Sequence, residues 1–269
     1  LMALKAASPG TGPIQARGWQ NHLFGPKGPT AAELDAVFGD RIVLIDSVDG
    51  HSTWYSTAAL KAGGVTAATP DPVPGSSFWE RDAAGNPTGT AREGADAEVA
   101  RRLLRPTAES YAAAFRRWLP RALESGLTGL FDAGMGAPDE AAAYQLLAGM
   151  EAAGQLPLRY FSSTANRGEA DDPVARLLQL KARYGGRLLR PTAVKLFADG
   201  VPEGHTAYLL ANYKDKADLN GQGFRGVPMM TDAHLDARIT AAEKAGVPVH
   251  VHAIGGAAVR QVLDAVARA

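Results

Sequence analysis

The chain has 269 residues and no cysteine. Disulfide bonds, iron–sulfur clusters and thiolate metal sites are therefore excluded. The absence does not distinguish compartments, because a cysteine-free protein suits a reducing or an oxidising one. Any bound metal must be held by His, Asp, Glu or a modified Lys.

Net charge and long apolar runs are also missing. The 28 basic residues are balanced by 28 acidic ones, so no basic field is available to attract nucleic acid or an anionic membrane. No apolar stretch approaches the roughly 18 residues that a bilayer-spanning helix needs. We expect a soluble, cytoplasmic protein that acts on a small molecule and binds neither nucleic acid nor a membrane.

Glycines mark a repeated pattern from residue 107 onward. An amphipathic helical stretch ends at a glycine, a short apolar strand follows, and a loop opens the next helix, as is typical of a parallel sheet. The four expected strands are LTGLFDAG, PLRYFSS, TAVKLFADG and VPVHVHAI. A closed (β/α)₈ barrel needs eight strands. We predict an α/β fold of (β/α)₈ TIM-barrel type with an incomplete barrel, whose βα repeats occupy residues 107–269.

Residues 1–106 are less regular, and we expect them to decorate the barrel as an N-terminal insertion. RIVLIDSV predicts a strand, STAALKAGG a helix, and SFWERDAAGNPTGTARE a β-hairpin with its turn at residues 84–87. An open parallel sheet leaves two bare edges, which proteins rarely tolerate. We expect this segment, the missing strands or a second copy of the chain to cover them.

The run VPVHVHAIGG places two histidines on one strand face. Residues two apart on a strand project to the same side, so His250 and His252 share a face. Chemistry in a parallel barrel gathers at the C-terminal strand ends, which puts His252 at the mouth and His250 one layer below. An imidazole at the mouth can bind a divalent metal. Two buried histidines hydrogen-bonded to neighbours remain an equal alternative.

Lys195 stands in the apolar strand AVKLFADG, where an unpaired ammonium would be costly. It must be paired with an acid, neutral, or modified, and a salt bridge at the mouth is the simpler interpretation. Carboxylation by CO₂ would instead create an anion able to bridge two metal ions. A free amine could form a Schiff base, with His252 as proton carrier. Asp199 follows in the adjoining loop.

Two further stretches contain candidate substrate-binding residues. In VDGHSTWYSTAAL, Asp49 and His51 form a turn after a strand, with Trp54 expected one helical turn beyond. His51 could bind substrate or act as an acid or base, or it could be an exposed residue of a helix-capping turn. His205, in GVPEGHTA, could face the same mouth as Lys195.

Taken together, several segments resemble the amidohydrolase superfamily, specifically the amidohydrolase family 3 branch that includes N-substituted formamide deformylases. The similar segments keep their order over nearly the whole chain: RGWQ, VDGHSTWYSTAAL, AAGNPTGTARE, GLTGLFDAG, VKLFADGVPEGHTA and VHVHAIGGAAVRQVLDA. The resemblance implies a (β/α)₈ barrel that hydrolyses amide or similar C–N bonds with one or two divalent metals, commonly zinc. It also implies that Lys195, free or carboxylated, and His252 are metal ligands, with His250 behind them.

The chain departs from that family pattern in several places. It lacks the first-strand H-x-H, the sixth-strand Glu-His pair and the eighth-strand Asp, and it has Gly256 and Ser56 where an Asp and an Asn are usual. We therefore expect an internal part of a longer hydrolase that by itself binds metal weakly and turns over little. The alternative is a non-catalytic half-barrel that assembles with a partner or a second copy.

Overall fold

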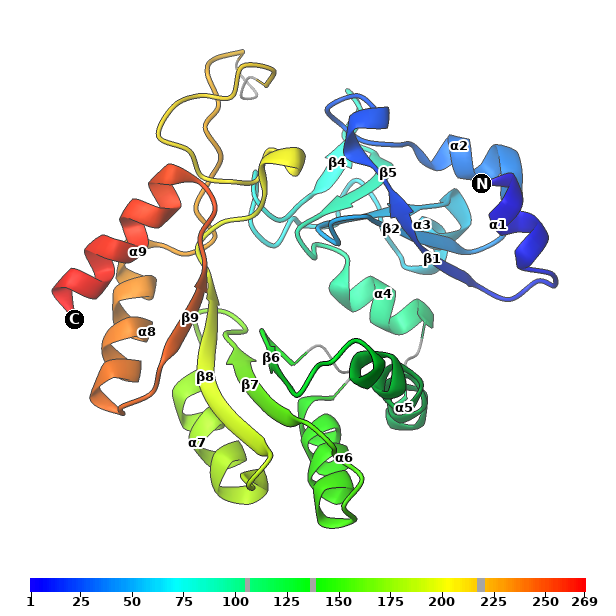
Figure 1. The fold of residues 1–269 in the computed structure, drawn as a ribbon. Helices are drawn as coiled ribbons and strands as arrows, with labels where there is room; N and C mark the ends of the chain where they lie inside the picture. Colours follow the sequence, from blue (N-terminus) through cyan, green and yellow to red (C-terminus); the bar gives the residue numbers. More distant parts are fainter. Residues whose placement is uncertain (105–106, 136–138, 217–220) are drawn as a thin grey trace. The chain divides into compact units, whose positions relative to one another are not determined.

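The computed structural model describes residues 1–104, 107–135, 139–216 and 221–269 and divides into two compact units (Figure 1). The first unit comprises residues 1–105, 199–229 and 253–260, and the second comprises residues 106–198, 230–252 and 261–269. The boundary expected between residues 106 and 107 adjoins residues 105–106, which lie outside the described part.

The first unit contains a five-stranded sheet with the strand order β1-β2-β3-β5-β4. Strands β1 and β2 are parallel, and the other pairs are antiparallel. The strands are β1 Ile14–Trp19, β2 Val43–Ser47, β3 Ser52–Tyr55, β4 Trp79–Arg81 and β5 Pro87–Arg92. The helices are α1 Met2–Ala7, α2 Ala31–Phe38, α3 Thr57–Ala62 and α4 Ala97–Leu104, with short 3₁₀ turns η1 Asn21–Leu23 and η2 Pro202–Gly204.

The strand, helix and hairpin predicted in this unit are confirmed. The predicted hairpin is β4 and β5, joined by a turn in which Asp82 N–H donates to the Asn86 carbonyl oxygen at 3.0 Å. Helix α3 begins after Ser56, whose hydroxyl oxygen accepts the Ala59 N–H at 3.2 Å, as is usual at an N-cap. The helical turn expected at Trp54 is wrong. Residues 52–55 form β3 instead, because the Thr-Trp-Tyr run packs well on a pleated surface.

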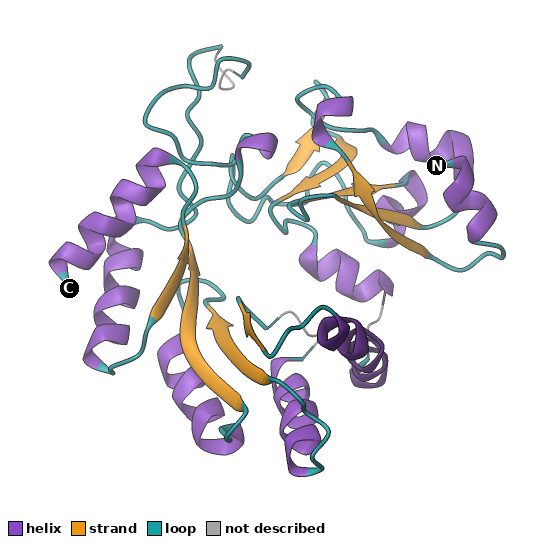
Figure 2. Cartoon of the chain, in the orientation of Figure 1, coloured by secondary structure: helices purple, strands orange, loops and turns teal. Residues whose placement is uncertain are grey.

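The second unit contains four parallel strands in the order β6-β7-β8-β9 (Figure 2). These are the four strands predicted from the apolar runs: β6 Gly129–Asp132, β7 Arg159–Ala165, β8 Leu189–Phe197 and β9 Val249–His252. The helices are α5 Ala108–Glu124, α6 Glu140–Ala152, α7 Pro173–Tyr184, α8 Asp232–Lys244 and α9 Gly256–Arg268, the last entering this unit at residue 261.

This parallel sheet is strongly curled. Phe131 lies on β6 and His250 on β9, the two ends of the strand order, yet their ring centroids are 5.3 Å apart. Three strand spacings in a flat sheet would separate the two backbones by about 14 Å. The sheet therefore forms a curled parallel half-barrel, which confirms the predicted α/β class; closure into a complete barrel stays a prediction.

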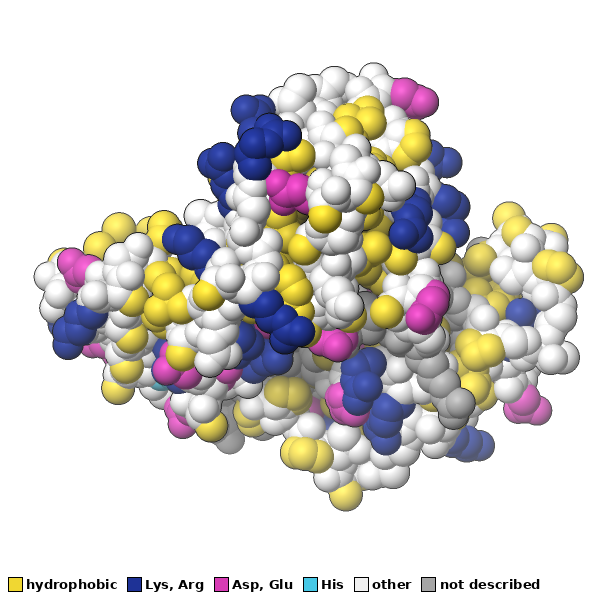
Figure 3. All heavy atoms as spheres, turned by 90° about the horizontal axis from the view of Figure 1, so that it is seen from below, with side chains coloured by type: hydrophobic (Ala, Val, Ile, Leu, Met, Phe, Trp, Pro, Cys, Tyr) yellow, Lys and Arg dark blue, Asp and Glu magenta, His cyan; other side chains and the backbone are white. Residues whose placement is uncertain are grey.

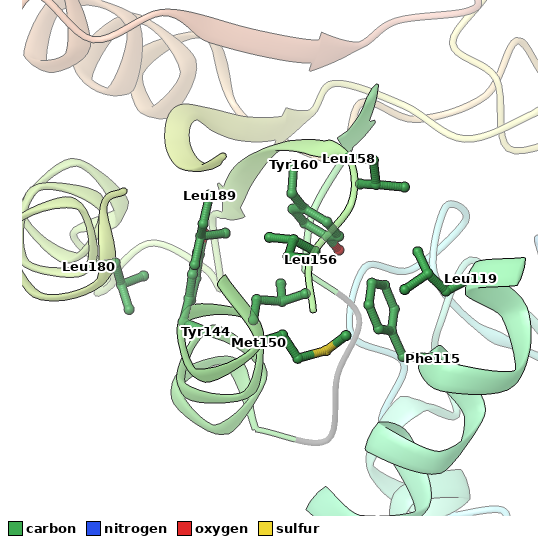
Figure 4. Close-up of a cluster of buried hydrophobic side chains, with 10 residues drawn as sticks. Phe115, Leu119, Tyr144, Met150, Leu156, Leu158, Tyr160, Leu180 and Leu189 are labelled. Atoms are coloured by element: carbon green, nitrogen blue, oxygen red, sulfur yellow. The ribbon is translucent and has the colours of Figure 1, made fainter. Parts of the chain in front are cut away.

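Helices cover the convex face of the half-barrel through two apolar clusters. The first joins α5, α6 and α7 to β7 and β8 (Figure 4), and its buried members are Phe115, Leu119, Tyr144, Leu147, Met150, Leu156, Leu158, Tyr160, Leu180 and Leu189. In the second, Val194 and Leu196 of β8 pack with residues of α7, α8 and α9, including Leu177 and Leu235. The alternate β8 residues consequently point to the concave side.

The surface has mixed character. On the face drawn in Figure 3, basic and acidic side chains both occur among apolar ones, in line with the balanced charge. Among the residues that the structure describes, no helix is both long and apolar enough to cross a membrane.

The packing of α7 gives a matched test of the fold. Leu177 is fully buried, whereas its neighbour Leu178 is 44% exposed. Leu177→Ala should lower the free energy of unfolding by about 2–5 kcal/mol, because a cavity adds to the lost apolar burial. Leu178→Ala should change it by less than about 0.5 kcal/mol. Urea unfolding of both variants measures the difference, and equal losses would contradict this packing.

Candidate functional site

The two metal ligands implied by the resemblance share one face of the half-barrel. Strands β8 and β9 pair with Lys195 beside His250 and Phe197 beside His252. All four side chains therefore point to the concave face, opposite the helix-packed Val194. Lys195 and His252 are diagonal neighbours on adjacent strands, as a shared metal would require.

Lys195 is buried on an apolar strand. Its side chain is 5% exposed, and Nζ lies 4.7 Å from the centroid of the Phe197 ring, within cation–π range. Across the described parts of the chain, no Asp or Glu forms an ion pair with it, so the expected salt bridge is not found there. Burial lowers the pKa of the Lys195 amine, because desolvation disfavours the charged form.

The two histidines of β9 differ in their surroundings. The His250 ring contacts Phe131, and its buried Nδ1 finds no hydrogen-bond partner among the described residues. Burial, and then the charges of Lys195 and His252, lower the pKa of His250, which favours a neutral ring. The His252 ring lies 6.0 Å from that of Phe197. Strand β9 is only half-buried, because no described strand pairs with its outer edge, so His250 and His252 are not the fully buried pair that the sequence offered as one alternative.

The donor set on the concave face is incomplete for a metal. A catalytic zinc takes three protein ligands. Lys195 supplies oxygen ligands only if its amine is carboxylated. Within the described ranges, no group of three or more His, Asp or Glu side chains is arranged to hold a metal ion. The face provides His252, His250 and Lys195, and a working centre would need further ligands.

In the first unit, Asp49 and His51 form an ordered turn before β3. The Asp49 carboxylate accepts hydrogen bonds from the His51 N–H at 3.0 Å, the Asn21 side-chain amide at 3.0 Å and the Ser47 hydroxyl. The His51 Nδ1 lies 2.8 Å from a carboxylate oxygen of Glu93. That hydrogen bond raises the pKa of His51. Sequence reasoning missed Glu93, whose only signal is an acidic residue directly after the hairpin.

Asp199 organises the loops around the paired glycines. One of its carboxylate oxygens accepts the Ile254 N–H at 2.9 Å, and the other accepts the N–H groups of Gly255 and Tyr208, each at 2.8 Å. A Cβ at position 255 would lie 2.0 Å from the Tyr208 carbonyl oxygen, so only glycine fits there. These bonds account for the buried carboxylate, and its contact with substrate stays a prediction.

His205 is held in the same unit. It is 5% exposed, its Nε2 lies 3.0 Å from Asp215 Oδ2, and its ring meets the Tyr213 ring edge-on at 4.9 Å. The hydrogen bond to His205 lowers the pKa of Asp215. Asp199 and His205 belong to the first unit and Lys195 to the second, so the expected common mouth stays a prediction.

The buried amine of Lys195 generates a test on stability. Its folded pKa lies below the unfolded value of 10.5, so the unfolded chain binds more protons between the two values and wild-type stability rises with pH there. Lys195→Met should raise the free energy of unfolding at pH 7 by about 1 kcal/mol, because it removes a desolvated cation. The gain should shrink toward pH 10.

Chemical unfolding in CO₂-free buffer measures this difference and keeps the amine unmodified. Lys181→Met, at an exposed position of α7, is the control and should leave stability nearly unchanged. A less stable Lys195→Met protein at pH 7 would contradict an uncompensated buried amine.

Comparison with known proteins adds independent information. The protein resembles the exoenzymes regulatory protein AepA of Pectobacterium carotovorum, with 32% identity over 99% of this chain and 56% of that protein. It is 31% identical to the putative amidohydrolase YtcJ of Bacillus subtilis, over 93% of this chain and 45% of that one. It is 28% identical to the N-substituted formamide deformylase of Arthrobacter pascens, over 91% and 44%. The chain thus spans about half the length of the relatives it matches.

Solved structures share the fold. An uncharacterised metal-dependent hydrolase from Pyrococcus horikoshii superposes with a TM-score of 0.60 and 24% identity, covering 97% of this chain and 48% of that one. A second, from Pyrococcus furiosus, gives a TM-score of 0.56 over 95% and 49%. A family model described as the amidohydrolase family matches residues 1–269. The chain therefore belongs to the amidohydrolase family.

Proposed function

We propose that the chain forms part of a metal-dependent hydrolase that cleaves amide or other C–N bonds. The observation that carries the proposal is the placement of Lys195 and His252 on one concave sheet face, in a chain of the amidohydrolase family. The relatives lend support, because one is named a putative amidohydrolase and another an N-substituted formamide deformylase.

His252 and Lys195 are the proposed metal ligands. His252 would bind through a ring nitrogen and Lys195 through the oxygens of a carboxylated amine. Carboxylation joins the amine nitrogen to the carbon of CO₂ and releases one proton, and it requires the neutral amine that burial favours. In a cysteine-free chain, one or two zinc ions are the metals that best match such nitrogen and oxygen donors. When bound, the metal would polarise the scissile carbonyl and supply an activated water.

The residues of the concave face have roles that do not depend on the bound metal. Phe197 lies against both Lys195 and His252 and limits how far their side chains can turn. Val194 and Leu196 fix β8 to the helices, so the position of Lys195 is set by packing on the other face. The proposed substrate-binding residues all lie in the first unit: Asp49, His51, Asp199 and His205.

Metal titration tests the assignment. The purified chain should bind Zn²⁺ weakly, because it supplies two of the three or more protein ligands that a catalytic zinc uses. His252→Ala should weaken zinc binding about tenfold or more. Isothermal titration calorimetry measures both proteins.

His22→Ala provides the control, because His22 is exposed in the first unit. Unchanged zinc affinity in His252→Ala would overturn the role of His252. Tight, stoichiometric zinc together with fast hydrolysis of an N-substituted formamide by this chain would overturn the incomplete ligand set.

A non-catalytic assembly is the second candidate. Phe131 and Phe197 are 45% and 38% exposed on the concave side of the half-barrel. Phe131 lies on β6, an end strand of the described sheet, and Phe197 lies on the inner strand β8. Apolar side chains exposed near an end strand suit a surface that another chain covers. A second copy of the chain is the proposed occupant.

Light scattering tests this candidate directly. The chain should then have twice the monomer mass, and Phe131→Ser should shift it toward the monomer by removing apolar contact area. Leu178→Ser, which changes an exposed leucine on α7, should leave the mass unchanged. A wild-type monomer at high concentration would exclude self-assembly.

A further inference from the structure

Three backbone N–H groups converge on the buried carboxylate of Asp199. The residue is 1% exposed, and its donors belong to Tyr208, Ile254 and Gly255, at 2.8 to 2.9 Å. An ionised carboxylate only accepts hydrogen bonds, so three N–H donors match it, and such charge-assisted bonds are stronger than neutral ones. The carboxylate therefore joins the chain that follows β8 to the chain that follows β9.

The two strands that end beside Asp199 carry the proposed metal ligands. Strand β8 ends at Phe197 and β9 at His252, and these two residues pair in the ladder. The Ala198 N–H then donates to the His252 carbonyl oxygen at 2.9 Å. The two loop N–H groups that donate to Asp199 come two and three residues beyond His252. The Asp199 bonds therefore continue the β8–β9 pairing past its last ladder bond.

The turn after β9 is held on both of its sides. The Tyr208 carbonyl oxygen accepts the Ala257 N–H at 3.0 Å and the Ala258 N–H at 3.2 Å, at the start of α9. The same carbonyl group approaches Gly255 so closely that a Cβ there has no room. Asp199 thus holds the N–H groups before the turn, and the Tyr208 carbonyl group holds those after it.

The loop that carries Asp199 is itself fixed. The Gly200 N–H donates to the Thr206 carbonyl oxygen at 3.1 Å, and the Val201 N–H donates to the Glu93 carboxylate at 3.1 Å. A Cβ at Gly200 would lie 2.3 Å from that carboxylate, and the Glu93 side chain is only 7% exposed. Asp199 is therefore supported by a backbone with contacts of its own, as a positioning group requires.

Strand β9 needs this support more than the other strands of its sheet. It has four residues, is half-buried, and is an end strand of the described sheet. Short strand ends with few buried contacts open more readily than the centre of a sheet. His252 is the last residue of β9, so opening there would move its ring away from Phe197 and Lys195.

We propose that Asp199 is a positioning residue that holds the end of β9, and with it the His252 ring, for metal binding. The inference rests on the proposed function, because it takes His252 as a metal ligand. A ligand that is fixed before the metal arrives loses less conformational freedom on binding. This role acts through the backbone and is separate from the substrate contact proposed for Asp199.

Hydrogen exchange in the metal-free wild-type chain tests the arrangement without any variant. The amide protons of Ile254 and Gly255 should exchange as slowly as that of Ala198, within about threefold, because the loop and the strand end open together. Fast exchange at Ile254 and Gly255 beside a protected Ala198 would overturn the proposal.

Asp199→Asn weakens the acceptor with little change of shape. Asn keeps one oxygen, but its NH₂ group would face backbone N–H donors. The nuclear Overhauser contact between the His252 and Phe197 rings, whose centroids are 6.0 Å apart, should therefore weaken. The contact between the His250 and Phe131 rings on the same face should persist as an internal reference. An unchanged contact between His252 and Phe197 would contradict the role of Asp199.

Zinc affinity in the absence of substrate provides the functional readout. Asp199→Asn should weaken zinc binding by about tenfold, toward the value of His252→Ala, as is usual when the support of a metal ligand is lost. Asp35→Asn is the matched control, because Asp35 accepts the Thr57 N–H at 3.0 Å at the start of α3. It should leave the zinc affinity unchanged. Isothermal titration calorimetry measures all four proteins.

The outcomes separate the two proposals. Equal zinc affinities in the wild type and His252→Ala would overturn the proposed function, and the exchange and ring measurements would still decide the role of Asp199. A loss in His252→Ala without a loss in Asp199→Asn would overturn the positioning role, as would an equal loss in Asp35→Asn. If Asp199→Asn does not fold, the wild-type exchange rates decide.

Discussion

The chemistry of the concave face depends on one constraint: the Lys195 side chain is buried away from water on an apolar strand. Lys195 has the Phe197 ring beside it and no carboxylate partner in the described structure. An amine in that position loses charge more readily than one in solvent. The carboxylation proposed for Lys195 starts from the neutral amine, which its burial favours.

Local patterns predicted the four parallel strands and the shared face of His250 and His252, whereas the assignment of Lys195 and His252 as metal ligands stays a prediction. Apolar runs between glycines located β6 to β9, because a buried parallel strand needs apolar side chains on its packed face. The two-residue period placed His250 and His252 on one side. Trp54 was misassigned because a four-residue strand is too short to show its period, and its antiparallel partners lie in other segments.

Partnerships over long sequence distances could not be predicted. Glu93 meets His51 across 42 residues and Thr206 across 113, and no local pattern encodes either meeting. The role of Gly255 is similar, because it depends on the Tyr208 carbonyl group that approaches its Cα. Such positions become interpretable only when the backbone path is known.

The contact between the Glu93 carboxylate and the Val201 N–H has a consequence for biosynthesis. Glu93 and Val201 are 108 residues apart, and β6, β7 and β8 lie between them in the chain. During translation, Glu93 leaves the ribosome well before Val201. Its carboxylate therefore cannot accept the Val201 N–H until β6, β7 and β8 have emerged. The unit that contains the N-terminus therefore completes this contact only after β6, β7 and β8 have been synthesised.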